Sequence, residues 1–210
     1  MNKRQIDLFF KTLDHRLGLK ANVIVTGASA GSLMGHIRPS VDIDFEILLS
    51  SKNPLTKARL ESAIDRAAKV AGVAVNFSEN MGGWSRINYL DYRKTAVPYK
   101  KIGKLKVKLI APEYWTIGKM ARFLELDIQD MIKIIKKKKL KPKSLIHIWT
   151  KAIRSSDLSL ELGQFRDHII YFLKTYAKKL WGSKTNASFL VEEFRLQAQT
   201  PAGRQKRNIR

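Results

Sequence analysis

The sequence predicts an α/β fold of the α+β kind, in which a small mixed β-sheet is followed by a helical C-terminal part. Two observations predict it. Short apolar runs alternate with helix-period segments only at first, and the period is helical from about residue 112 onward. The later strands are joined by short links, which indicates a mixed sheet. We expect one domain over residues 1–135, a helical region over 136–200, and a basic disordered tail over 201–210.

The elements of the first half follow from apolar spacing and from glycine and proline stops. Residues 3–17 are expected to form an amphipathic helix, because apolar side chains recur at helical spacing at Ile6, Phe9, Phe10, Leu13 and Leu17. A second helix is expected in "NPLTKARLESAIDRAAKVAG", which has a proline near its start and a glycine at its end. Strands are expected in "NVIVTG", "VDIDFEILL", "VAVNFSE", "RINYLDY" and "LKVKLIAP".

The second half is predicted to be helical. One long helix is expected in "PEYWTIGKMARFLELDIQDMIKIIKK", with its apolar face formed by Trp115, Met120, Phe123, Leu124, Met131 and Ile135. The stretch "KKKKLKPK" (136–143) is expected to be a basic hinge. Further helical segments are expected over about 144–180 and 187–198.

The charge of the chain points to a polyanionic partner. It has 40 Lys and Arg against 18 Asp and Glu, a net charge of +22. A phosphate backbone favours such a surface through counterion release, so nucleic acid is the expected partner. No apolar run is long enough to span a membrane, and there is no cysteine for a disulfide or a thiolate metal site. We expect a cytoplasmic protein with no membrane partner.

Two aspartates stand inside an apolar strand, where charge is costly. Asp42 and Asp44 are two residues apart and therefore point to the same face, while Val41, Ile43 and Phe45 are expected to face the core. Two carboxylates this close stay ionised when a cation lies between them, and oxygen ligands of this kind suit Mg²⁺ or Mn²⁺. The alternative is a pair that only caps or solvates a strand end.

The segment upstream, "TGASAG", is a strand-to-helix turn of small residues. Small side chains let backbone amides approach a phosphate, and the start of a helix favours an anion. A phosphate cradle beside a carboxylate pair is the pattern of a metal–nucleotide site.

These two features carry a resemblance to a family. The positions concerned are Gly27, Ala30, Leu33, Gly35, Arg38, Ser40, Asp42, Ile43 and Asp44. They resemble the first motif of the minimal nucleotidyltransferases of the polymerase-β superfamily, and in particular the AbiEii-like toxin group. A second motif of that group is similar to Pro112, Glu113, Lys119, Arg122, Asp127 and Asp130.

The resemblance implies transfer of a nucleoside monophosphate from a nucleoside triphosphate (NTP) to an acceptor hydroxyl, with release of pyrophosphate. It implies Mg²⁺ or Mn²⁺ as cofactor and catalytic roles for Asp42, Asp44, Lys119 and Asp127. Nucleotide binding is implied for Gly27, Ala28, Ser29, Ser32, Arg38 and Lys119. Ser29 or Ser32 would supply the hydroxyl that Ala28 lacks, and the alternative for Arg38 is to brace the loop. The acceptor would be RNA, with tRNA as the first candidate, and the protein would be the toxin of a toxin–antitoxin pair with an antitoxin protein as partner. Ala28 departs from the glycine or serine that usually follows the motif glycine.

A third carboxylate usually completes such a metal site, and two candidates stand open. If "RINYLDY" is a strand, Asp91 shares a face with Ile87 and Tyr89 and is a candidate metal ligand; the alternative is an exposed strand end. Asp127 is the other candidate, by resemblance. Glu46 lies on the face of the aspartate pair but further along the strand.

Lys119 lies eleven residues before Asp130, about three turns, so one continuous helix would place both on one face. Lysine suits a triphosphate as a compact charge. The alternative is an ordinary solvated lysine.

Two other functions compete with transfer to RNA. A small-molecule nucleotidyltransferase of the antibiotic-modifying kind is disfavoured, because its cationic acceptors would be repelled by a charge of +22. A catalytically silent nucleic-acid-binding module on the same fold is the third possibility.

Overall fold

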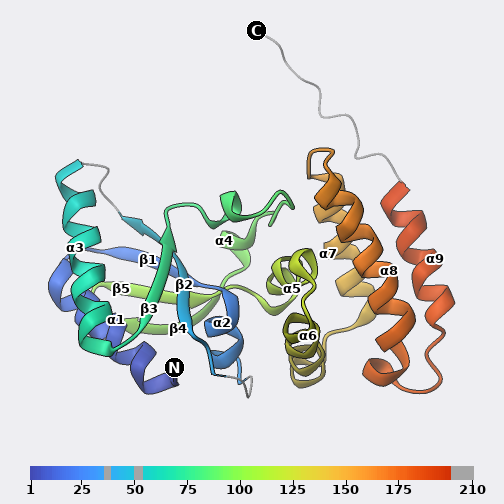
Figure 1. Ribbon diagram of the computed structural model, residues 1–210, viewed down its shortest axis with the longest axis horizontal. Helices are drawn as coiled ribbons and strands as arrows, with labels where there is room; N and C mark the ends of the chain where they lie inside the picture. The colour runs from blue at the N-terminus through green and yellow to red at the C-terminus, as the bar shows by residue number, and fades with distance from the viewer. Residues whose placement is uncertain (36–38, 50–53, 200–210) are drawn as a thin grey trace, which may run out of the picture. The chain divides into compact units, whose positions relative to one another are not determined.

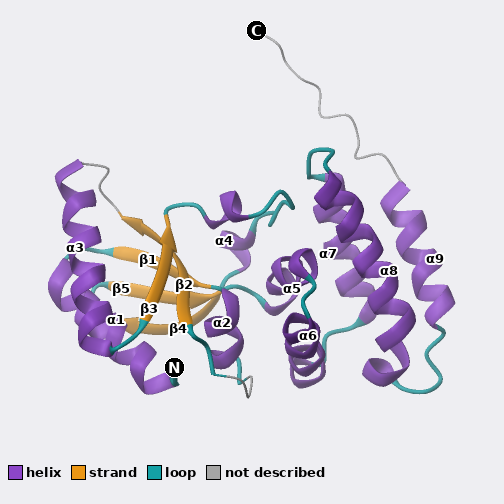
Figure 2. Ribbon diagram, in the orientation of Figure 1, coloured by secondary structure: helices purple, strands orange, loops and turns teal. Residues whose placement is uncertain are grey.

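The computed structural model describes residues 1–35, 39–49 and 54–199, and it confirms a mixed α/β fold (Figure 2). The described residues form two compact units. The sheet unit comprises Met1–Gly83 and Asp91–Ala111, and the helical unit comprises Trp84–Leu90 and the residues from Pro112 on. The division therefore falls at 111/112 and not at the expected 135, which lies inside a helix over Glu125–Lys138. The tail predicted over 201–210 lies outside the described residues.

The sheet has five strands in the order β3-β2-β1-β5-β4. Antiparallel pairs join β1 to β2 and β4 to β5, while β1–β5 and β2–β3 are parallel, so the sheet is mixed as expected. The strands are β1 (Ala21–Val25), β2 (Asp42–Leu49), β3 (Ala74–Ser78), β4 (Val97–Ile102) and β5 (Leu105–Leu109).

Two helices cover the sheet. Figure 1 shows α1 (Lys3–Leu17) and α3 (Pro54–Ala71) side by side. All five predicted apolar residues of α1 are buried, and a capping box between Asn2 and Gln5 starts the helix. Phe9 and Phe10 pack on Phe45 of β2, with ring centroids 5.6 and 5.8 Å apart, so α1 closes the core behind the strand that carries the aspartates.

One predicted strand is wrong. Residues 86–92 form no strand; Leu90 has φ 59° and a short helix, α4, begins at Tyr92 and ends at Thr95. The Asn88 side chain accepts a hydrogen bond from Leu90 N (2.6 Å) and donates one to Ser155 O (3.0 Å). These bonds make a turn that the alternating pattern of the sequence conceals. The fifth strand is instead β4, which was not predicted.

The helical unit contains α5 (Pro112–Arg122), α6 (Glu125–Lys138), α7 (Pro142–Arg154), α8 (Leu160–Trp181) and α9 (Ala187–Gln199), the last three side by side in Figure 1. The predicted long helix is divided at Phe123, which has φ 53° and whose ring stacks on His168 at 4.4 Å. Leu124 is accordingly 61% exposed and not part of the buried face. The segment predicted over 144–180 is likewise two helices, with Ser159 capping the second.

The core of the helical unit is aromatic. Trp115, Trp149, Phe165 and Phe172 are almost fully buried, and Trp149 Nε1 donates to Thr116 Oγ1 (2.9 Å), so its one polar atom is satisfied. Across the described residues, no helix is both long enough and apolar enough to cross a bilayer.

Candidate functional site

The aspartate pair lies at the start of β2. Asp42 and Asp44 are half-buried, while Ile43 and Phe45 between and beyond them are fully buried, so the two carboxylates share the face opposite the core as predicted. Val41 does not share the core face, because it precedes the strand and is 83% exposed.

Gly27 packs directly against Asp44. It begins α2 (Gly27–Leu33) at φ 59°, and a Cβ built on it would overlap the Asp44 carboxylate, 2.7 Å from Cγ and 2.9 Å from Cβ. Thr26 N donates to Asp44 O (2.8 Å), which fixes the turn to the strand. The glycine of the first motif is therefore required by backbone conformation and by the space the carboxylate occupies.

Asn76 is a residue of the site that the sequence did not reveal. It lies on β3 in register with Asp44, and its Nδ2 donates to Asp44 Oδ1 (3.3 Å). Its only signal is an amide inside the apolar run "VAVNFSE", where asparagine is unfavourable in a strand. The contact orients the Asp44 carboxylate from the neighbouring strand.

The Asp42 carboxylate has no hydrogen-bond or ion-pair partner among the residues that the structure describes, although its backbone carbonyl accepts from Ser40 Oγ (2.7 Å). Two half-buried carboxylates on one face are a hard-oxygen donor set that fits Mg²⁺ or Mn²⁺. Within the described ranges no group of three Asp, Glu, His or Cys side chains is placed to hold a metal, so neither Asp91 nor Glu46 joins the pair there.

The remaining residues of the turn differ in exposure. Ala28 and Ser32 are half-buried. Ser29 is fully buried and its hydroxyl donates to Thr26 O (2.8 Å), so this side chain braces the turn. Arg38, predicted to bind nucleotide, lies outside the described residues.

Glu46 has a structural role. It is fully buried, and it accepts hydrogen bonds from Arg93 Nε (2.8 Å), Met81 N (3.0 Å) and the Tyr92 hydroxyl. Burial, together with the hydrogen bond and charge of Glu46, raises the pKa of Tyr92 to about 12. The hydrogen bond to Glu46 also raises the pKa of Arg93. Glu46 thus ties β2 to the segment before β4.

Asp91 is exposed and stands at the start of α4, where its carbonyl accepts from Lys94 N (2.9 Å). The strand face that was to place it beside Ile87 and Tyr89 does not exist, because residues 86–92 form a turn. Asp91 therefore has no strand position from which to join Asp42 and Asp44 at a metal ion.

Lys119 and Asp127 contact each other inside the helical unit. Lys119 is 3% exposed, and its Nζ donates to Asp127 Oδ1 (2.8 Å) and Asp130 Oδ2 (2.9 Å). Arg122 donates to both oxygens of Asp127 (2.7 and 3.0 Å). Lys119 and Asp130 thus meet as predicted, but through the turn between α5 and α6 and not along one helix.

These four residues form a neutral cluster of two cations and two anions. Burial alone would raise the pKa of Asp127, but hydrogen bonds from Arg122 and Lys119 and their charges lower it below its ordinary value. Lys119 Nζ also lies 5.2 Å from the centre of the Trp115 ring. The hydrogen bonds of this cluster join α5 to α6. This structural role accounts for the spacing of the second motif without a bound nucleotide.

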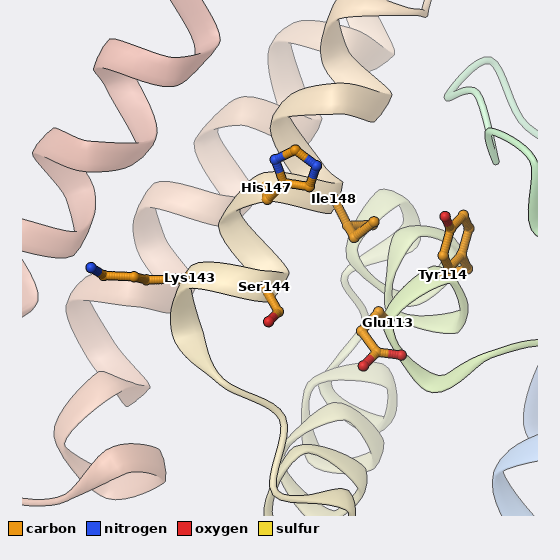
Figure 3. Close-up of a pocket in the computed structure, with 6 residues that line it drawn as sticks. All are labelled: Glu113, Tyr114, Lys143, Ser144, His147 and Ile148. Atoms are coloured by element: carbon orange, nitrogen blue, oxygen red, sulfur yellow. The ribbon is translucent and has the colours of Figure 1, made fainter. Parts of the chain in front are cut away.

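A pocket of about 460 Å³ opens between the start of α5 and the first turns of α7, lined by Glu113, Tyr114, Lys143, Ser144, His147 and Ile148. Figure 3 shows the Lys143 side chain extending away from Glu113, so the polar groups do not converge on one point. The pocket includes none of the predicted catalytic residues.

Comparison of the chain with protein-family models, with curated proteins and with solved structures finds no match.

Proposed function

We propose that the protein is a metal-dependent nucleotidyltransferase that moves a nucleoside monophosphate from an NTP to RNA, with tRNA as the first candidate acceptor. The observation that carries the proposal is the packing of Gly27 against Asp44 on a strand whose same face presents Asp42. A strand-to-helix turn that packs directly against one carboxylate of the pair supports the resemblance to the polymerase-β superfamily.

The chain's own residues act by holding and positioning. Asp42 and Asp44 would hold Mg²⁺ or Mn²⁺, with Asn76 orienting the Asp44 carboxylate. The bound ion would supply charge neutralisation for the phosphates and activation of the acceptor oxygen. Gly27 keeps the turn close to the carboxylates, where the triphosphate would lie, and Ala28 and Ser32 are the accessible positions beside it.

The net charge of +22 supports RNA as the acceptor, because each phosphate that a lysine or arginine neutralises releases counterions, and this release favours binding. The resemblance to the AbiEii-like group supports the proposal that the protein is a toxin with an antitoxin protein as partner, acting in the cytoplasm where NTPs and RNA are abundant.

A catalytically silent RNA-binding module is the second candidate, and one observation favours it. Lys119 and Asp127, which the resemblance makes catalytic, are buried and bonded to each other. A module that only binds RNA would keep the cluster for stability and would need no metal at Asp42.

The test is incubation of the protein with α-labelled NTPs, one at a time, with Mg²⁺ or Mn²⁺ and total cellular RNA. We expect label in an RNA band with the wild type and none with Asp42→Asn. Asp65→Asn, at an exposed position on α3, is the matched control and should transfer as the wild type does. Equal transfer by the wild type and Asp42→Asn would reject the site, and no transfer with retained RNA binding would favour the silent module.

A parallel reaction with a cationic aminoglycoside in place of RNA separates the acceptors. Label transferred to the aminoglycoside and not to RNA would make the protein a small-molecule nucleotidyltransferase.

A further inference from the structure

Lysines from two distant parts of the sequence gather at one end of the helical unit. Trp181, the last residue of α8, donates from Nε1 to the carbonyl of Leu140 (2.8 Å), which lies between α6 and α7. This bond fixes the C-terminal ends of α6 and α8 beside each other. The exposed lysines there, which we call the basic end, are Lys136, Lys137, Lys138, Lys139, Lys141, Lys178, Lys179 and Lys184.

The two segments that meet there lack acidic residues. No Asp or Glu occurs over residues 131–156 or over 168–191. The exposed lysines of the basic end therefore have no carboxylate within their own segments to neutralise them. These lysines are exposed to solvent.

Helix dipoles account for only part of this charge. Cations in the last turn of a helix are stabilising, which explains Lys136–Lys138 on α6 and Lys178–Lys179 on α8. Lys141 and Lys184 lie beyond the helices, and Lys139 is the C-cap in a left-handed conformation that lysine adopts only at a cost. The positive charge therefore extends beyond the helix ends, where the helix dipoles no longer stabilise it.

We propose that the basic end is the surface on which the helical unit binds the phosphate backbone of RNA. The inference rests on the proposed function for the identity of the polyanion. The surface consists of lysines, which contact phosphate as point charges and do not read bases by bidentate hydrogen bonds. The helical unit therefore contributes affinity and orientation of the acceptor, and sequence preference lies elsewhere.

The test compares two variants of equal charge by tRNA binding over a salt series, without NTP or metal. The first replaces Lys136, Lys138, Lys178 and Lys179 by Gln. The control replaces Lys11, Lys57, Lys69 and Lys101, which are exposed on the sheet unit, by Gln. Both lower the net charge by four, so long-range attraction is matched and only local contacts differ.

We expect the first variant to bind tRNA about tenfold or more weakly near 0.15 M salt, with a salt slope smaller by up to about four, while the control keeps nearly the wild-type slope. Half-variants, with only the α6 pair or only the α8 pair replaced, should each give about half the change. Circular dichroism checks that each variant is folded.

Equal losses in the two four-lysine variants would overturn the proposal, and so would a half-variant of α8 with no effect, since the surface would then not be composite. Binding of acidic polyglutamate but not tRNA would replace RNA with an acidic protein partner. The binding assay needs no nucleotide transfer. Its outcome therefore does not depend on whether the protein is a nucleotidyltransferase.

Discussion

Single residues set the geometry of the aspartate pair. A Cβ at position 27 would overlap the Asp44 carboxylate, so the turn can adopt its present form only because residue 27 is glycine. Asn76 completes the arrangement from β3. Glu46, two positions further along β2, is removed from any metal chemistry by Arg93 and Tyr92. Asp42, Asp44 and Glu46 are equally spaced along one strand. The side chains that contact each carboxylate nevertheless give it a different role.

Gly27→Ala tests this arrangement, and Gly72→Ala is its matched control. Both positions have a left-handed φ, 59° and 62°, so both variants carry the same backbone strain, about 1–3 kcal/mol. Only at position 27 does the new Cβ meet the Asp44 carboxylate; at position 72 it meets nothing within 4 Å. We expect loss of metal-dependent NTP binding in Gly27→Ala alone, measured by calorimetry. Unchanged binding in Gly27→Ala would separate the turn from the site.

Lys119 is predicted to be essential for stability. Lys119→Ala removes the buried ammonium that pairs with Asp127 and Asp130, so the free energy of unfolding should fall by about 3–5 kcal/mol in urea denaturation. Lys133→Ala, at an exposed position on α6, should change it by less than about 0.5 kcal/mol. A Lys119→Ala protein as stable as the wild type would return this lysine to a role in nucleotide binding alone.

Asp127 should make the protein sensitive to acid. Its pKa is lower in the folded state than the unfolded value of about 3.9, so the unfolded chain binds more protons below that pH. The stabilisation is complete above about pH 4 and is lost as the pH falls through the folded pKa. Unfolding free energies measured between about pH 2 and 5 should fall less steeply in Asp127→Asn than in the wild type. Parallel curves would contradict the lowered pKa.

At the scale of elements, the short segment Trp84–Leu90 belongs to the helical unit although the chain on both sides of it belongs to the sheet unit. Asn88 bonds to Ser155 and Ser156, and the Tyr89 hydroxyl lies over Gly118 of α5. The chain thus passes from one unit to the other three times, so three covalent links join the two units.

Gly118→Ala tests the packing of this segment. Alanine normally stabilises a helix by about 0.5–1 kcal/mol over glycine. At position 118, however, its Cβ would overlap the Tyr89 hydroxyl and lie 3.1 Å from Cζ, so we expect destabilisation instead. Gly163→Ala on α8, with nothing within 4 Å, should show the ordinary gain. Thermal unfolding of the two variants should shift in opposite directions, and a gain in both would mean that Tyr89 moves away freely.

Local periodicity made three features predictable from the sequence. They are the helix over 3–17, four of the five expected strands and the shared face of the aspartates. The breaks at Phe123 and at 155–159 were not predictable, because the apolar pattern continues across them and only tertiary contacts, such as Phe123 on His168, show where the chain turns. Residues 86–92 have the alternating pattern of a strand, and only tertiary contacts, such as Asn88 with Ser155, show that the chain turns there.

The contact of Asn76 with Asp44 depends on the pairing of β3 with β2, which the sequence pattern does not reveal. Spacing placed Lys119 near Asp130, but it did not show that the contact is made across the turn between α5 and α6.

At the scale of the whole molecule, the two units divide the proposed work. The sheet unit carries the aspartate pair, and the helical unit carries the basic end and the neutral cluster of Lys119, Arg122, Asp127 and Asp130. Each unit has its own aromatic core, so substitutions at the basic end leave the aspartates in place. Catalysis and RNA affinity should therefore be separable by mutation.

The most direct measurement compares NTPs labelled at the α or the γ phosphate in reactions with RNA and Mg²⁺ or Mn²⁺. If Asp42 and Asp44 support nucleotidyl transfer, the α label appears on RNA, the γ label leaves in pyrophosphate, and Asp42→Asn abolishes the signal. Transfer of the γ label, or α-label transfer that survives both Asp42→Asn and Asp44→Asn, would contradict the account.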